Sequence, residues 1–184
     1  MSVPTDGRDP RAAHALARLR QLGAAELEHP GGTLLAHLVG VRDRLAGWGA
    51  RPELRRAGLC HAFYGTDGFP SGLLPVERRT ELAAVIGPGA EELVYFYASC
   101  DRGVSHPTLA DVSGPWRDRF TGRVYCPDIR SRRDFAELSA ANELDLADHD
   151  PAFRAAHGAA LRGLFERWAP LLSEPARRDC GALA

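Results

Sequence analysis

The sequence contains no lysine, and all 23 of its basic residues are arginine. This absence excludes Schiff-base chemistry and general-base catalysis by lysine. Basic and acidic residues nearly balance, at 23 and 24, and the formal net charge is -1. The chain therefore lacks the positive excess that is typical of proteins that bind nucleic acids or membrane surfaces. We expect neither nucleic acid nor membrane among its partners.

Cysteine is scarce as well, and no two cysteines have the CxxC spacing of a zinc ribbon. The four are Cys60, Cys100, Cys126 and Cys180. Long apolar runs are missing too, because no segment approaches the ~18 residues of a membrane span. Residues 2–11 are polar, which does not suit a secretory signal peptide. These absences together predict a cytoplasmic protein with reduced thiols.

What is present is an ordinary globular composition, with 45% hydrophobic and 26% charged residues in 184 positions. That length predicts a single domain. Apolar residues recur at helical spacing and alternating β-branched runs are few, so we expect an all-α fold of about six to eight helices. The expected helices cover residues 10–22, 33–49, 52–63, 76–86, 89–100, 131–147 and 151–172. Thr33, Ser131 and Asp150 are the expected caps, and residues 173–184 are expected to form a frayed polar tail.

Residues 103–130 interrupt the helical pattern with several prolines, glycines and aromatic residues. So long an irregular stretch inside a compact domain favours a functional role. One interpretation is a lid that excludes water from a site. The other is a solvated surface loop with Arg–Asp pairs, and a short hairpin within residues 119–125 is compatible with both.

Three ionisable residues are predicted on the buried sides of helices. His37 shares a face with Leu34 and Leu38, His61 ends the next helix, and Asp101 follows a run of apolar residues. A buried carboxylate is costly unless it is paired or bound to a metal, and these three side chains could share one divalent ion. The structural alternative is a pair of core histidines bonded to carbonyls, with Asp101 capping or pairing locally.

Two strings carry a family resemblance, HPGGTLLAHL at residues 29–38 and HAFYGTDGF at residues 61–69. Over about residues 25–150 the chain resembles the HD-domain superfamily, and in particular a branch of small HD-like proteins. The resemblance implies an all-helical bundle in which a histidine, a His-Asp doublet and a distant aspartate surround one or two metal ions. It predicts a core at residues 25–150, an insertion or lid at 103–130, a C-terminal helix at 151–172 and a tail at 173–184.

The chain departs from the family at Ala62, which stands where the doublet has its aspartate. The phosphohydrolase chemistry that depends on that doublet is therefore not expected. His37, His61 and Asp101 have the composition of a two-histidine, one-carboxylate site, which suits Fe(II) with open positions for substrate and O2. Some HD-like enzymes are iron oxygenases. The same three ligands suit a catalytic zinc, or manganese, that activates water.

We therefore expect a mononuclear metal-dependent enzyme that acts on a small polar molecule, with non-haem iron oxidation as the first choice. A Zn- or Mn-dependent hydrolase of a phosphoester or amide-like bond is the alternative. A metal-free HD-like protein that only binds a ligand is the third.

Further candidates surround this predicted site. His29 is a candidate extra ligand or general base, Tyr64 a candidate proton donor, and Asp67 a candidate replacement for the missing carboxylate. Their structural alternatives are an exposed loop histidine, a core tyrosine and a turn aspartate. Arginine forks bind carboxylate or phosphate, so substrate contacts are expected largely from the arginines of the insertion. The expected substrate-binding residues are Arg102, His106, Arg117, Arg119 and Asn142.

Overall fold

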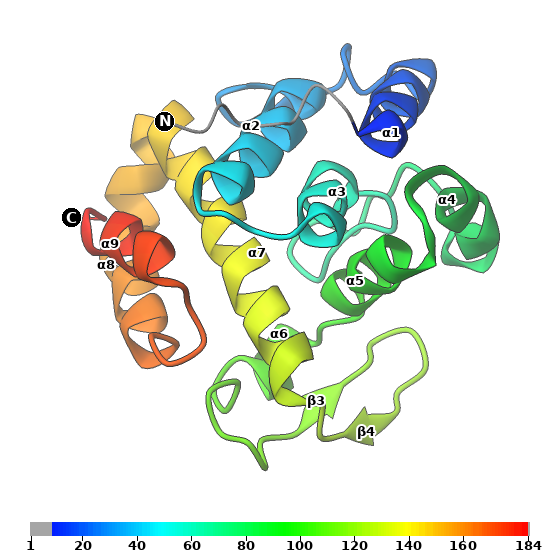
Figure 1. Cartoon of the computed structure of the whole chain (residues 1–184). Coiled ribbons are helices and arrows are strands. Elements are labelled where there is room, and N and C mark those ends of the chain that lie inside the picture. The colour runs from blue at the N-terminus through cyan, green and yellow to red at the C-terminus, as the bar shows by residue number, and fades with distance from the viewer. Residues whose placement is uncertain (1–8, 184) are drawn as a thin grey trace.

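The computed structural model describes residues 9–183, which form nine α-helices, one short 3-10 helix and two small hairpins (Figure 1). The helices are α1 (Pro10–Gln21), α2 (Leu34–Gly47), α3 (Pro52–Cys60), α4 (Arg79–Ile86), α5 (Pro88–Ala98), α6 (Arg102–Ser105), α7 (Ile129–His149), α8 (Pro151–Arg167) and α9 (Glu174–Gly181); η2 covers Val76–Arg78. The hairpins pair β1 (Glu28–His29) with β2 (Gly32–Thr33) and β3 (Trp116–Arg117) with β4 (Val124–Tyr125). The prediction of a mainly helical fold is confirmed.

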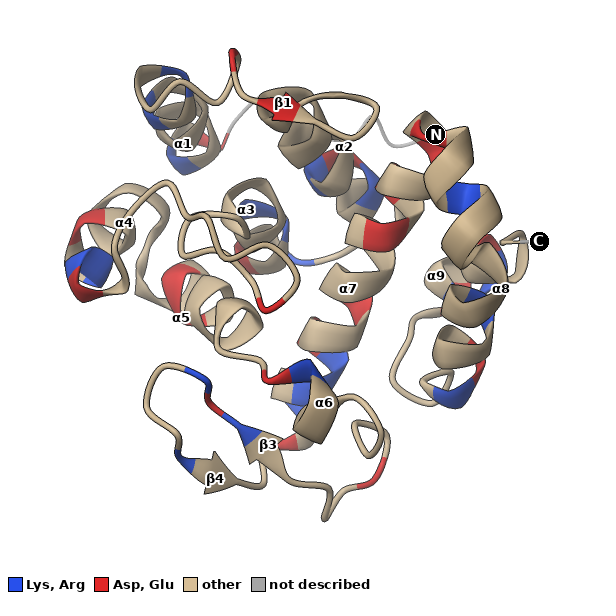
Figure 2. Ribbon diagram, turned by 180° about the vertical axis from the view of Figure 1, so that it is seen from behind, with Lys and Arg blue, Asp and Glu red and all other residues tan. Residues whose placement is uncertain are grey.

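Helix α7 runs through the middle of the molecule, with α2, α3 and α5 on one side and α8 and α9 on the other (Figure 1). Thirteen of its 21 residues are buried, which is why its sequence shows no clear apolar stripe. One part of the core surrounds α7, and a second part lies between α1, α3, α4 and α5. Basic and acidic residues are interspersed along the helices, as the near balance of charge predicts (Figure 2).

Polar side chains set several helix starts. Thr33 and Asp150 cap α2 and α8, as predicted, by accepting hydrogen bonds from backbone N–H groups of the first turn. The prediction of Ser131 as a cap is wrong. Helix α7 begins earlier, at Ile129, because the Asp128 carboxylate accepts a hydrogen bond of 2.7 Å from the Ser131 N–H.

The C-terminal segment is helical, which corrects the expectation of a frayed tail. Ser173 caps α9, and both its N–H and its hydroxyl donate to the Glu137 carboxylate on α7. Ala176 and Cys180 are buried against the core. Because α9 and the four-residue α6 were not expected, the described residues contain nine helices instead of six to eight. None of these helices is long and apolar enough to cross a membrane.

The insertion at residues 103–130 is tightly anchored. The buried Arg132 guanidinium donates to backbone carbonyls of Leu109, Val112 and Gly114 at 3.0, 3.2 and 2.6 Å, and to that of Pro127 at 3.0 Å. A hairpin is present with strands at residues 116–117 and 124–125, so its first strand begins before the expected residues 119–125. A charged side chain on α7 therefore replaces the hydrogen-bond partners that this irregular backbone would otherwise lack.

Candidate functional site

Three histidines from separate elements meet between α2, α3 and α7. His29 lies on β1, His37 in the first turns of α2, and His61 directly after α3. The His29 and His37 rings stack with centroids 4.2 Å apart, and the His61 ring meets His37 edge-on at 5.3 Å. The structure thus brings together two of the predicted ligands and the predicted general base.

The Pro-Gly-Gly turn explains why His29 reaches this cluster. Gly31 has a φ of +82°, and a Cβ there would lie 2.6 Å from His149 Cβ and 2.9 Å from its carbonyl carbon. Glycine therefore allows the turn to close against the end of α7. The closed turn folds β1 back over α2 and places the His29 ring on His37.

His37 is fixed by two residues of α7. Its Nδ1 lies 2.7 Å from Asp145 Oδ2 and its Nε2 lies 3.0 Å from Asn142 Oδ1, with all three side chains buried. A Cβ at Gly40 would overlap Asp145 Oδ1. The absence of a side chain at Gly40 is thus what allows the Asp145 carboxylate to lie beside α2 and hold the imidazole.

His61 is held through its Nδ1, which lies 2.7 Å from the Gly58 carbonyl. Because a carbonyl only accepts, Nδ1 carries the proton, and the Nε2 of the neutral ring is left as an acceptor beside the Asn142 side chain. Burial, together with the nearby His37, lowers the pKa of His61 to about 3. Burial likewise lowers the pKa of His29 to about 4, and His29 Nδ1 is a buried atom with no partner among residues 9–183. Both imidazoles are therefore neutral at neutral pH.

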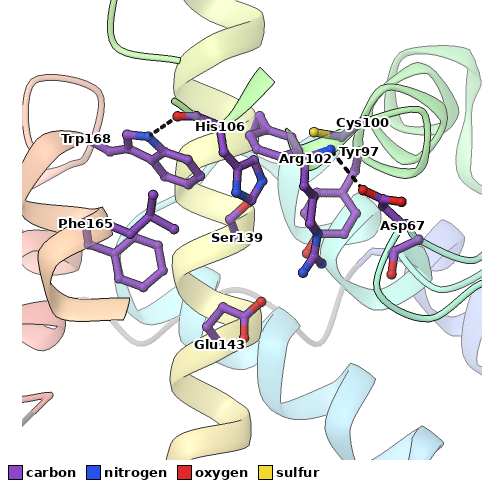
Figure 3. A pocket seen from close by; sticks show the side chains of 12 residues that line it. Asp67, Tyr97, Cys100, Arg102, His106, Ser139, Glu143, Phe165 and Trp168 are labelled. Carbon is purple, nitrogen blue, oxygen red and sulfur yellow. Dashed lines mark hydrogen bonds between the residues drawn. The ribbon is translucent and has the colours of Figure 1, made fainter. Parts of the chain in front are cut away.

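A cavity of about 260 Å³ opens over His29 and His61. Its walls are largely apolar, and besides the two imidazoles its polar lining includes Thr66, Arg102, Asn142 and Glu143. A smaller cavity of about 20 Å³ adjoins it and shares Thr66, Tyr97, Arg102 and Glu143 (Figure 3). The apolar lining of the larger cavity includes Leu34, Phe69, Tyr97, Leu146 and Phe153.

Asp101, the third predicted ligand, lies elsewhere. It caps α6 by accepting a hydrogen bond of 3.2 Å from the Val104 N–H, and its Oδ2 lies 3.8 Å from Arg117 Nη1. It lines neither cavity. Across residues 9–183, no three His, Cys, Asp or Glu side chains are arranged as a ready group of metal ligands. The structure therefore joins His37 and His61 without Asp101.

The carboxylate that accompanies the histidines is Asp145, which the sequence analysis missed. A signal was available, because Asp145 shares the buried side of α7 with Leu138 and Ala141. A carboxylate on a buried helix face needs a partner, just as Asp101 was expected to need one. Glu143, the neighbour of the predicted Asn142, lines both cavities, and only the tertiary structure places it there.

Five of the other predicted residues line the cavities. His29 and Asn142 line the larger one, His106 lines the smaller one, and Arg102 lines both. Asp67 also lines the smaller cavity, where its carboxylate accepts a hydrogen bond of 3.0 Å from the Arg102 N–H (Figure 3). It does not take the place of the missing doublet aspartate beside His61.

The remaining three predicted residues line neither cavity. The Tyr64 hydroxyl donates to Glu91 at 2.8 Å in a buried network. The Arg119 guanidinium donates to the Ala98 and Tyr64 carbonyls, at 2.6 and 3.3 Å. Arg117 lies beside Asp101. From the insertion, only His106 lines either of the two cavities, so most of this segment is not placed as a lid over them.

Comparison with known protein families finds a similarity over part of the chain. Residues 18–102 match a family described as a domain of unknown function, DUF6817. The matching segment contains all three clustered histidines and ends at Arg102, before α7 supplies Asn142 and Asp145. No curated protein and no solved structure matches the chain. The chain is thus similar to that family over slightly less than half of its length.

Proposed function

We propose that this chain is a metal-dependent enzyme that acts on a small polar molecule in the cavity over His29 and His61. The observation that supports this is the cluster of three imidazoles, two of which line the cavity. Titratable groups that cluster at a concave pocket, some of them with shifted pKa values, favour a functional site over a structural one. We also propose that the fold is of the HD type, which the sequence resemblance over about residues 25–150 implies.

The donor set fits a divalent ion. Metal-ligating histidines usually hold their second ring nitrogen on a carboxylate or a backbone carbonyl, as His37 does with Asp145 and His61 with Gly58. His29 adds a buried nitrogen without a protein partner. We assign His37, His61 and His29 as the side chains that would hold the ion. Asp145 would orient His37 and would not bind the ion as Asp101 was expected to do. A bound ion would polarise the substrate or activate water or O2.

The chain's own residues prepare the site for that chemistry. Asp145 and the Gly58 carbonyl orient the imidazoles of His37 and His61. Burial keeps His29 and His61 unprotonated, so their lone pairs remain available. The apolar walls of the cavity limit the access of water to the substrate.

Iron oxidation remains our first choice for the reaction, and hydrolysis with zinc or manganese the second. Iron(II) accepts imidazole ligands and can leave positions open for substrate and O2, while Asp145 would act by orienting His37. A third candidate, a metal-free binding protein, is favoured by one observation: His37 Nε2 contacts Asn142 Oδ1, and this contact must open for the nitrogen to reach an ion.

The test is the metal content of protein purified without oxygen, in the parent and two variants. We expect about one equivalent of metal in the parent and in Asp101→Asn, and none in His61→Ala. Iron would select oxidation, and zinc or manganese would select hydrolysis. Equal metal content in the parent and His61→Ala, or no metal in a parent supplied with each ion, would contradict the proposal. A melting curve of His61→Ala shows that the variant is folded.

A further inference from the structure

Arg102 occupies an unusual position for an arginine of this protein. It is the first residue of α6 and lines both cavities. Its backbone N–H is bound by Asp67, and its guanidinium lies against Gly68, where a Cβ would be 3.1 Å from Nη1. Within residues 9–183, this guanidinium makes no hydrogen bond and no ion pair. Arg51 and Arg79, by contrast, form two-pronged pairs with Asp134 and Glu91.

Two carboxylates lie near Arg102, but neither is bonded to its guanidinium. Glu143 faces the same space and makes no hydrogen bond or ion pair with Arg102 (Figure 3). The Asp67 carboxylate is held by the Arg102 N–H, not by the guanidinium. His106 is neutral at neutral pH, because burial lowers its pKa to about 4. A partly buried guanidinium without a bonded anion is costly, so the cavity favours an anionic ligand.

Two buried nitrogen atoms without partners belong to residues that line these cavities. His29 Nδ1 belongs to the larger cavity and His106 Nε2 to the smaller one, and Arg102 lines both. Buried polar atoms are nearly always hydrogen-bonded, and unsatisfied ones call for a specific explanation. A bound ligand with polar atoms near the guanidinium would provide it.

We propose that the cavity binds a small organic monocarboxylate, whose carboxylate pairs with the Arg102 guanidinium and whose apolar body lies along Leu34, Phe69 and Phe153. The proposal rests on the proposed function, because it names the substrate class of that same cavity. A carboxylate suits the site better than a phosphate for two reasons. A single guanidinium pairs with either anion through two parallel hydrogen bonds, but its one positive charge balances a carboxylate and leaves a phosphate monoester with excess negative charge. The carboxyl groups of Asp67 and Glu143 nearby disfavour a ligand of higher negative charge.

The experiment measures binding of straight-chain carboxylates from butanoate to octanoate by calorimetry and ligand-observed NMR. The alcohols of the same length serve as neutral controls, and propyl phosphate serves as the competing anion. The protein variants are Arg102→Gln, Arg102→Lys and the control Arg117→Gln. All measurements use EDTA-treated protein, so a failure of metal binding does not affect the result.

We expect at least one carboxylate to bind the parent more tightly than its alcohol. Arg102→Gln should raise the Kd of that carboxylate ~10-fold or more and leave the Kd of the alcohol unchanged, since one charge-assisted pair is lost. Arg102→Lys should give a smaller rise, and Arg117→Gln none. The proposal is overturned if no carboxylate binds, if Arg102→Gln has no effect, or if propyl phosphate binds more tightly than every carboxylate.

Discussion

Gly40 is the residue that decides how closely Asp145 approaches His37. A methyl group at this position would overlap Asp145 Oδ1, so Gly40→Ala should displace the carboxylate and weaken its contact with the imidazole. We expect a loss of about 1–3 kcal/mol in the free energy of unfolding. Gly47→Ala on the same helix is the matched control, because a Cβ there meets nothing within 4 Å. Urea unfolding of both variants checks this, and equal stability of the two would contradict the packing described.

The depressed pKa of His61 has a consequence for stability. Its folded value of about 3 lies below the ordinary value of 6.5, so the unfolded chain takes up a proton first as the pH falls. The stability that neutral His61 contributes is therefore fully present above pH 6.5. This contribution decreases as the pH falls toward 3, by up to ~1.4 kcal/mol per pH unit. Urea unfolding of EDTA-treated protein at pH 7.5 and 5 measures this decrease. It should be smaller in His61→Gln and unchanged in His14→Gln, whose side chain is exposed. Identical pH dependence in all three proteins would contradict the lowered pKa of His61.

At the scale of elements, a single arginine of α7 anchors the long insertion. Arg132→Met should leave buried carbonyls of residues 109–114 without donors and lower the free energy of unfolding by about 3 kcal/mol. Limited proteolysis should then cut within residues 108–116. Arg133→Met is the control, because Arg133 is exposed beside it. If Arg132→Met resists the protease as well as the parent does, the insertion is held by other contacts.

The sequence predicted most helices but not the elements that depend on distant partners. Periodicity located α2, α3, α5 and α8, because each has an apolar face and a clear start. It did not locate α9, whose start depends on Glu137 of α7, and it placed the α7 cap at Ser131 because the preceding residues contain prolines and glycines. The Ser173 cap of α9 is a local signal, but only the tertiary structure shows that Glu137 holds it.

At the scale of the whole molecule, the site also contains residues that local spacing predicts and residues that only tertiary packing brings together. The inward positions of His37 and His61 follow from helical spacing and were predicted. Asp101 was not placed correctly by spacing, because the chain turns at the end of α5 and uses this carboxylate to cap α6. The true carboxylate partner, Asp145, lies 108 positions after His37 in the sequence. Only the packing of α2 against α7 brings the two together.

Ala62 offers a test of how complete the site is. It lines the larger cavity directly beside His61 and is buried. Ala62→Asp adds the carboxylate that HD-type doublets have, so we expect tighter metal binding, by about tenfold or more, and slower reaction with O2. Competition with a chelator measures the affinity. Weaker metal binding in Ala62→Asp than in the parent would contradict the placement of the ion next to His61.

The most direct test of the central claim is a titration of the metal-free, isotope-labelled chain with Zn²⁺, followed through the imidazole NMR signals. Zinc is a diamagnetic probe that imidazole ligands accept readily. The account predicts that the signals of His29, His37 and His61 change and saturate at one equivalent, while those of the exposed His14 and His157 do not. Unchanged signals from all three clustered histidines at one equivalent of zinc would contradict it.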